Sequence, residues 1–344
     1  MPSASHPRSG VAIVGASSLL GKELKAVLED RNFPAGEIIL LDESEAAGTL
    51  TEASGEPAFI RTLEEDSFEH ARFAFFAGSR QDALRNMAVA ERSGSTVIDM
   101  TGAAAQSGRA TMWIPSVAPL LAPVPGTSAN GSPKALSYFS PAAPVIISCA
   151  LSAGLARFSP VRLAIQFFPP VSEHGQPGID ELETQTAALL SFQPIAKPLF
   201  DAQVAFNLLA SYGPESKASL EELRESTARD SSRYLAGGAL VPAVQFIHVP
   251  AFFGYAFSAF AEFPAPLPPE PLEASLAAVG IKLNAAADAA SSNAGIAGEN
   301  EIHIASIAPD LSVPSGVWIW GLADNLRLAA LNAVRIAEEL LANE

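Results

Sequence analysis

Short apolar runs alternate with stretches of helical spacing over the first hundred residues of the chain. The runs are uninterrupted, which is typical of parallel strands that are covered on both faces. After the first run, apolar residues recur at helical spacing from Leu19 to Arg31. Strands and helices that alternate at this pitch predict a doubly wound parallel sheet, an α/β architecture. The predicted strands are 11–14, 38–41, 73–77 and 96–99, and the predicted helices are 19–31 and 83–90.

The pattern changes beyond this region. Repeated prolines predict an irregular crossing segment over 104–144. Longer strands then flank helices, which predicts an α+β second domain with antiparallel strands. A strand at 145–147 is predicted directly after the crossing segment. The predicted elements of the second domain are strands at 161–168 and 241–249, a buried strand pair within 246–263, and helices at 150–158, 179–190 and 220–234. A last helix at 325–341 has the apolar period of a packed helix, and we expect it to return to the N-terminal domain.

A glycine turn directly follows the first predicted strand. The segment from Gly15 to Gly21 has the span of G-x-x-G-x-x-G, with Ser18 in place of the central glycine. The first glycine permits a tight turn, and the last lets the following helix lie close to the strand. This context predicts a Rossmann-type dinucleotide-binding domain, in which the helix N-terminus faces a pyrophosphate. The candidate cofactor-binding residues are Gly15, Ser17, Ser18, Leu19, Gly21, Asp42, Gly78 and Asn325.

An acidic residue ends the second predicted strand. Asp42 is placed to accept hydrogen bonds from both ribose hydroxyls and to repel a 2′-phosphate, so NAD is favoured over NADP if a cofactor binds. The alternative is that Asp42 and Glu43 are solvated loop acids in a fold that has lost its ligand.

Composition narrows the classes of partner. The net charge is -16, which argues against a surface that binds nucleic-acid phosphates. The single cysteine excludes an internal disulfide and a zinc site of several thiolates, and no metal site is expected. Neither a signal peptide nor a run long enough to span a membrane is visible, so we expect a cytoplasmic protein without a membrane partner.

Motifs spread from residue 11 to residue 340 resemble those of the aspartate-semialdehyde dehydrogenase family. They include the opening turn, the strand Val97-Ile98-Asp99, the helix at 178–190, the segment Val-Pro-Ala-Phe-Phe-Gly at 249–254 and the Asp-Asn-Leu-Arg segment at 324–327. The resemblance implies an enzyme that reduces an acyl phosphate to a semialdehyde in amino-acid biosynthesis. A cysteine thiolate would attack the acyl carbon, a histidine would move protons, and NAD(P) would supply hydride. Arginines would hold the substrate, and the second domain would form a homodimer.

Several reacting residues of that family are replaced. The resemblance places Cys149 at or near the nucleophile of the family's Asn-Pro-Asn-Cys motif, at a helix N-terminus that would lower the pKa of its thiol. Tyr255 stands at the histidine position, and a phenol is a poor base at neutral pH. His248 stands at the position of the carboxylate-binding arginine. The family's phosphate-binding arginine has no counterpart, and its glutamine falls on Pro169 or, with a shifted strand, on Gln166.

Together these patterns predict a divergent paralogue whose activity is impaired or repurposed. Two alternatives stay open. One is an active NAD-linked aldehyde oxidoreductase with Cys149 as nucleophile and His174 as a recruited base. The other is a non-catalytic NAD-sensing or structural partner of a genuine dehydrogenase. The expected organisation is a disordered lead-in at 1–10, a dinucleotide-binding domain at 11–148, a dimerisation (substrate) domain at 149–322, and a C-terminal helix at 323–344.

Overall fold

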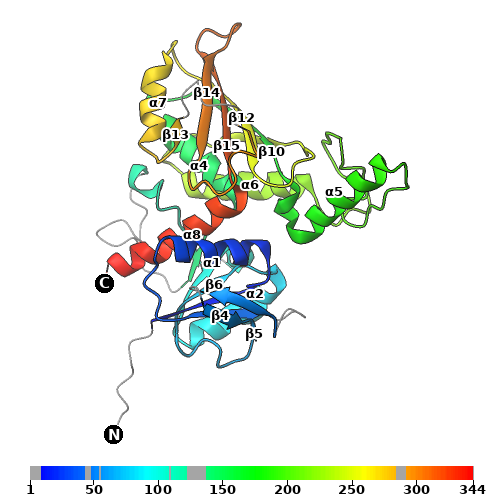
Figure 1. Ribbon diagram of the computed structural model, residues 1–344. Helices are drawn as coiled ribbons and strands as arrows, with labels where there is room; N and C mark the ends of the chain where they lie inside the picture. Colours follow the sequence, from blue (N-terminus) through cyan, green and yellow to red (C-terminus); the bar gives the residue numbers. More distant parts are fainter. Residues whose placement is uncertain are drawn as a thin grey trace. The chain divides into compact units, whose positions relative to one another are not determined.

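The computed structural model describes residues 9–42, 48–53, 56–107, 110–121, 137–283 and 292–343. Most of the expected lead-in therefore lies outside the described residues. The chain divides into two compact units (Figure 1). Unit 1 comprises residues 1–115, 124–141 and 329–344, and unit 2 comprises residues 116–123 and 142–328. The main segment of unit 2 thus begins at Ala142, before the boundary that the sequence places after residue 148.

Unit 1 is built on a parallel sheet with the strand order β5-β2-β1-β6-β7-β9-β8. Its strands are β1 (Gly10–Val14), β2 (Ile38–Asp42), β5 (Arg61–Thr62), β6 (Ala71–Phe76), β7 (Thr96–Asp99), β8 (Thr111–Met112) and β9 (Ser137–Phe139). All five residues of β1 are buried, as expected of a central strand covered on both faces. The chain runs outward from β1 to β2 and then crosses to β6 on the other side of β1. This confirms the predicted doubly wound sheet. A separate hairpin is formed by β3 (Leu50–Ala53) and β4 (Glu56–Phe59).

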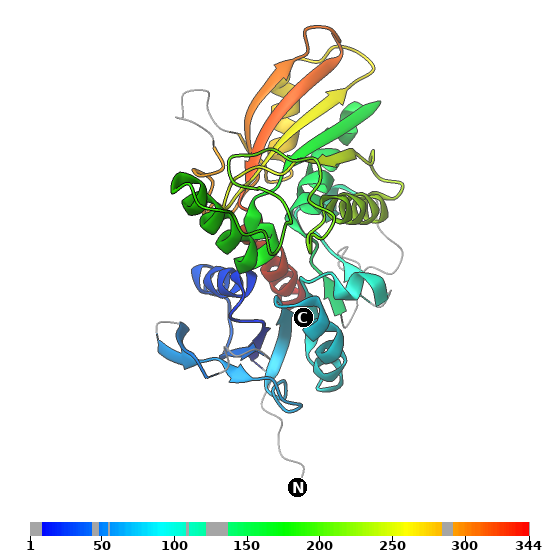
Figure 2. The ribbon, with the colours of Figure 1, turned by 90° about the vertical axis from the view of Figure 1, so that its right-hand side faces the viewer.

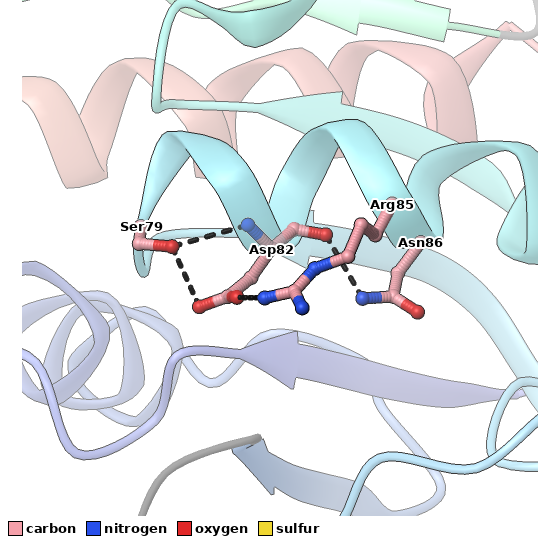
Figure 3. A network of polar contacts seen from close by, with 4 residues as sticks. All are labelled: Ser79, Asp82, Arg85 and Asn86. Atoms are coloured by element: carbon pink, nitrogen blue, oxygen red, sulfur yellow. Dashed lines mark hydrogen bonds and ion pairs between the residues drawn. The ribbon is translucent and has the colours of Figure 1, made fainter.

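The helices of unit 1 begin at side-chain caps. Ser18 caps α1 (Leu19–Asp30) and Ser79 caps α2 (Arg80–Arg92). In the α2 cap, Ser79 Oγ accepts a hydrogen bond from Asp82 N at 3.1 Å and donates one to the Asp82 carboxylate at 2.6 Å (Figure 3). Arg85 pairs with the same carboxylate from the next turn. The serine thus ends the preceding loop and starts the helix. A short helix, α3 (Ala103–Ser107), follows β7.

The C-terminal helix, α8 (Asn325–Ala342), belongs to unit 1 from residue 329 onward. Arg31 at the end of α1 forms a two-pronged ion pair with Glu338, with N···O distances of 2.7 and 2.8 Å. Buried Asn332 donates hydrogen bonds to Trp113 O and to Ser140 Oγ. These contacts attach the end of the chain to the first sheet, where the sequence predicted that it would return.

Unit 2 contains a mixed sheet with the order β11-β10-β12-β15-β14-β13. Its strands are β10 (Arg162–Phe168), β11 (Ala243–Phe246), β12 (Tyr255–Glu262), β13 (Lys282–Leu283), β14 (His303–Pro309) and β15 (Gly316–Ala323). The four central strands pair antiparallel, as predicted. Along β12, buried and half-buried residues alternate, so one face of the sheet is covered and the other is not. Helices α4 (Ala143–Leu155), α6 (Leu220–Leu235) and α7 (Pro269–Ala277) contribute to the packing of the unit (Figure 2).

Two sequence predictions for unit 2 are wrong. Residues 145–147, predicted as a strand, lie inside the continuous helix α4, and every residue of that helix is buried. A helix covered on all sides has no polar face, so its apolar run looks like a buried strand. The expected strand pair within 246–263 is a single strand, β12, preceded by an irregular loop.

An arm of unit 2 is formed by the short helix η3 (Val171–His174), by α5 (Gly175–Leu190) and by the loop up to residue 219. Buried Gln185 holds this loop to α5. Its amide oxygen accepts from Val204 N at 2.8 Å, and its amide nitrogen donates to Ala202 O at 3.0 Å. Within the described residues, no helix is long and apolar enough to cross a membrane.

Candidate functional site

The glycine turn lies in unit 1 at the point where the strand order reverses. Gly15 has φ +82°, a left-handed conformation that favours glycine. A Cβ atom on Gly15 would come within 2.2 Å of Gly78 Cα, so the loops after β1 and β6 touch through their backbones. Ligands of open α/β sheets bind at such a switch point, beyond the carboxyl ends of the strands. The candidates Gly15, Gly21 and Gly78 therefore lie together.

The serines of the turn are already engaged within the protein. Ser18 Oγ accepts from Gly21 N at 2.9 Å and donates to Ala77 O at 2.8 Å. Ser17 donates to the Asp42 carboxylate from its backbone N at 3.1 Å and from its hydroxyl at 2.6 Å. Asp42 is the last residue of β2 and is buried, and these bonds hold its carboxylate toward the turn.

The shape of the turn fits a dinucleotide, but the hydrogen-bond donors of the turn are less available to it. The close Gly15–Gly78 contact preserves the narrow turn, and α1 starts at Leu19 as required. However, the N–H groups of Ser17 and Gly21 already have partners in the protein. A pyrophosphate would have to compete with these bonds. When bound, the nicotinamide would supply hydride chemistry.

Replacing Ser18 tests the cap. We expect Ser18→Ala to lower the free energy of unfolding by about 1 kcal/mol, because the N–H of Gly21 loses its acceptor. Ser18→Gly, which restores the family's central glycine, should lower the free energy of unfolding by only about 0.3 kcal/mol. Urea unfolding followed by circular dichroism measures both. Equal losses for the two variants would contradict a capping role.

Cys149 is not at a helix N-terminus, which corrects the prediction. Helix α4 begins at Ala143, so Cys149 lies in its middle and is fully buried. The residues at the start of the helix are Ser140, Pro141, Ala142 and Ala143. Of these four residues only the proline is shared with the family's Asn-Pro-Asn-Cys motif, and when Pro141 is set against that proline, Ala143 stands opposite the cysteine.

The environment of Cys149 suppresses its thiolate. Burial raises the pKa of the thiol to about 12; a contact with the Ser231 hydroxyl lowers it in part, and the charge of Asp230 raises it. At neutral pH the thiol is protonated, and the thiolate is the form that acts as a nucleophile. Both neighbours belong to α6, so Cys149 packs between helices.

Three of the other predicted residues do come together, in unit 2. His174, Tyr255 and His248 gather with Glu173 and Tyr212, and we call these five residues the Tyr255 cluster. Glu173 and His174 end η3, Tyr212 lies in the arm loop, His248 follows β11, and Tyr255 opens β12. Hydrogen bonds from Val171 N to Ala251 O and from Ser172 N to Phe252 O join η3 to the loop between His248 and Tyr255.

The state of His248 follows from its two partners. Its Nε2 lies 3.2 Å from Val204 O, and since a carbonyl only accepts, Nε2 carries the proton. Its Nδ1 lies 3.3 Å from the hydroxyl of Tyr212 and accepts from it. Burial lowers the pKa of His248, although the bond to Val204 raises it in part. His248 is therefore a neutral imidazole and lacks the charge of the family's arginine.

His174 and Tyr255 are also neutral near pH 7. Burial, together with a smaller effect of His248, lowers the pKa of His174 to about 4. Its Nε2 is buried without a hydrogen-bond partner among the described residues. Burial and the neighbouring Glu173 raise the pKa of Tyr255 well above its usual value. Tyr255 is fully buried on the covered face of the sheet, where its ring packs edge-on against Phe167.

Glu173 is the group of the cluster that titrates near neutrality. Burial raises the pKa of its carboxyl to about 7, and a contact with the Tyr255 hydroxyl lowers it in part. That contact departs from good hydrogen-bond geometry, since the Tyr255 hydroxyl has no well-formed partner in the described part of the chain. Burial and the charge of Glu173 also raise the pKa of Tyr212. The cluster thus contains one group that can be anionic and none that is cationic at pH 7.

Two further candidates lie outside this cluster. Asn325 opens α8 within unit 2, where its side chain donates to Ser172 Oγ at 3.1 Å and accepts from Gly254 N at 3.2 Å. Asp324 caps the same helix through the N–H groups of Leu326 and Arg327. Gln166 lies on the uncovered face of the sheet, whereas the adjacent Phe167 contacts Tyr255.

One group of potential metal ligands occurs elsewhere in unit 2. Glu299, Glu301 and His303 offer ligand atoms within 4.8 Å of one another. Lys282 Nζ lies 3.5 Å from the Glu299 carboxylate, so a cationic side chain already neutralises this group in part. We assign no metal site there.

Sequence reasoning missed three residues of the site. Ala143, at the start of α4, was passed over because the motif was placed on the only cysteine of the chain, six residues further on. Glu173 was passed over beside His174, although an acid next to a histidine in a glycine-rich loop is a signal for a titrating pair. Tyr212 gave no signal, because only the folded arm brings it to His248.

The fold and the site together define a dinucleotide-binding unit joined to a mixed-sheet unit. Family models match both: residues 10–121 match the semialdehyde dehydrogenase NAD-binding domain, and residues 156–328 match the semialdehyde dehydrogenase dimerisation domain. The second match spans half of the chain. The chain belongs to the semialdehyde dehydrogenase family.

Similar proteins cover the chain almost completely. A USG-1 protein homolog of Pseudomonas aeruginosa is 30% identical, over 96% of this chain and 97% of its own length. Aspartate-semialdehyde dehydrogenase 2 of Vibrio cholerae is 27% identical, over 96% of this chain and 97% of its own length. A crystal structure of aspartate-semialdehyde dehydrogenase II from Vibrio cholerae, complexed with ASA, superposes with a TM-score of 0.85 at 25% identity, and covers 98% of this chain and 99% of that one.

Proposed function

We propose that this protein is a member of the semialdehyde dehydrogenase family that has lost the family reaction and acts as a dimeric binding protein. The observation that carries the proposal is the start of α4. Ala143 stands there in place of the nucleophile, and a methyl group cannot form the thioester that the family reaction requires. The only cysteine is buried in the same helix, and the pKa of its thiol is about 12.

The proton-transfer and charge-clamp positions support the same conclusion. Tyr255 stands where the family has its acid/base histidine, and the pKa of its phenol is raised further by burial. A well-placed general acid or base contributes about 10²–10⁴ in rate. His248 replaces the arginine that would hold the substrate carboxylate, and it is neutral. Without the nucleophile, the acid/base histidine and the carboxylate-binding arginine, the steps of the family reaction cannot take place.

A turnover assay tests the loss of activity. We expect no NADH or NADPH when the protein is incubated with aspartate semialdehyde, phosphate and either dinucleotide. A catalytically competent family member serves as the positive control. Turnover that disappears in Cys149→Ser would support the alternative, an active oxidoreductase with His174 as recruited base. Turnover that persists in that variant would still overturn the proposed loss.

We propose that a dinucleotide, if bound, is NAD. The Asp42 carboxylate, buried beside the turn, would repel a 2′-phosphate. Calorimetry with NAD and NADP tests the preference, and we expect Ser18→Gly to bind more tightly than the natural chain because it frees the N–H of Gly21. Tighter binding of NADP than of NAD would contradict the role of Asp42.

We propose that the uncovered face of the unit 2 sheet pairs two copies of this chain. The residues on this face are mostly uncharged, and they include the half-exposed tryptophans Trp318 and Trp320. Other residues that face the same way include Ala164, Gln166, Phe168, Ala256, Ser258, Phe260, Ser306, Ala308 and the ion pair of Arg162 with Glu262. A large uncharged aromatic face is typical of a protein interface.

Light scattering tests this interface. We expect a dimer at micromolar concentration, and we expect Trp320→Asp to shift the protein toward the monomer. Leu311 is fully exposed at the turn between β14 and β15 and offers a matched control. Leu311→Asp should leave the dimer unchanged. A monomeric natural chain, or equal effects of the two variants, would contradict the assignment of the face.

A further inference from the structure

The Tyr255 cluster lacks the cation that the family resemblance would place in it. The neutral His248 stands at the position of the carboxylate-binding arginine, and the cluster contains an acid, Glu173. Lysine and arginine contribute none of the five cluster residues, and the charges that influence them come from within the cluster. An anion placed here would meet Glu173 without any compensating cation.

Two buried polar atoms of the cluster can act as hydrogen-bond acceptors. Tyr255 Oη and His174 Nε2 are both buried without a well-formed partner in the described part of the chain. Such atoms are rare in folded proteins, and each calls for an explanation such as a bound molecule. Together with the Glu173 carboxylate they make three acceptor groups. An ammonium group has three N–H donors and no acceptor.

Aromatic rings supply the surroundings that a cation prefers. The ring of Phe200 lies 5.3 Å from the His174 ring and 4.7 Å from the Tyr212 ring, measured between centroids. Faces of tyrosine and phenylalanine attract cations when the site is shielded from water. As whole residues Glu173 and His174 are half-buried, whereas Tyr255 and His248 are fully buried.

We propose that the Tyr255 cluster binds a ligand that presents an ammonium group and no strong anion, with Glu173 as the counter-ion. This inference rests on the proposed function, in which the site no longer carries out the family reaction. Tyr255 and His174 would orient the ammonium through their buried acceptor atoms. Binding draws Glu173 into its ionised form, so a proton is released at pH 7.

Calorimetry with n-butylammonium chloride tests this proposal, with n-butanol and sodium butyrate as neutral and anionic probes of the same chain length. We expect n-butylammonium to bind, with greater affinity at pH 8 than at pH 6. Glu173→Gln should weaken binding about tenfold or more, the scale of a lost hydrogen bond to a charged group. Tyr255→Phe should weaken it by a smaller factor.

Glu183 is exposed on α5 and provides the matched control, because Glu183→Gln changes the net charge of the protein in the same way as Glu173→Gln. Glu183→Gln should leave the affinity unchanged. Absence of n-butylammonium binding, equal binding of butyrate, or an unchanged affinity in Glu173→Gln would each overturn the inference. The turnover assay is independent of these probes. An inactive protein that fails to bind n-butylammonium would refute the inference alone, and an active protein would refute the proposed function.

Discussion

Glu173→Gln should stabilise the protein above pH 7 by about 2–3 kcal/mol and change little at pH 4.5. The pKa of Glu173 is about 7 in the folded protein, above its ordinary value of 4.5, because the carboxyl is buried. The folded state therefore holds this proton more tightly than the unfolded state. As the pH rises from 4.5 to 7, stability is lost, and above pH 7 the full cost of the buried carboxylate is present. Glutamine never ionises and avoids this cost.

His174 contributes a pH dependence of the opposite sign. Its pKa of about 4 in the folded protein is below the ordinary 6.5, so the unfolded state binds the proton more tightly. Stability is lost as the pH falls from 6.5 to 4, and His248 acts in the same direction. Between pH 4.5 and 6.5 the effects of Glu173 and His174 oppose each other. The natural chain should therefore have a flatter stability profile there than either single variant.

Urea unfolding at pH 5, 6.5 and 8 measures these profiles. Glu173→Gln should show stability that rises with pH, and His174→Gln should show stability that falls with pH. Glu183→Gln, which removes an exposed carboxyl from the same arm, should follow the natural chain. Parallel profiles for all four proteins would show that neither buried group has a shifted pKa.

Gln185→Leu should lower the free energy of unfolding by about 3 kcal/mol or more. The Gln185 amide donates to Glu181 at 3.0 Å and to two carbonyls of the arm loop, and it accepts from Val204 N. Leucine fills a similar volume and leaves these buried groups without a partner. Each lost partner costs about 1–3 kcal/mol.

The matched control for this change is Gln176, which lies on the same helix and donates only to exposed Asp180. Gln176→Leu should change stability by less than about 0.5 kcal/mol. Chemical unfolding gives both values, and limited proteolysis should cut the arm loop faster in Gln185→Leu alone. A loop that is cut at the same rate in both variants would mean that Gln185 does not hold it.

The sequence predicted unit 1 well because each of its elements has a local signal. The strand at 11–14, the glycine turn and the capped helix from Leu19 follow one another without interruption, and the sheet rules then determine the order of the strands. The hairpin of β3 and β4 and the edge strand β5 were not predicted, and the short elements between 104 and 144 also lacked such signals. Proline removes hydrogen-bond donors there, so local pattern favours neither helix nor strand.

The site of unit 2 could not be predicted in the same way. His174, His248 and Tyr255 could be placed because motifs flank each of them. Their neighbour Tyr212 is brought in by the arm loop, whose path depends on the buried Gln185. The first turns of helix α4 were predicted as a strand because a wholly buried helix has no polar face. The start of the helix at Ala143 was missed for the same reason.

The edges of the unit 2 sheet limit how copies of this protein can assemble. The outer strands β11 and β13 have four and two residues, so neither offers a long row of unpaired backbone groups to another strand. Growth by adding strands edge to edge, which leads to filaments, is thereby discouraged. When two copies associate through the face of this sheet, the same face is buried on both copies, and the two copies are related by a two-fold axis. Assembly through this sheet then stops at two copies.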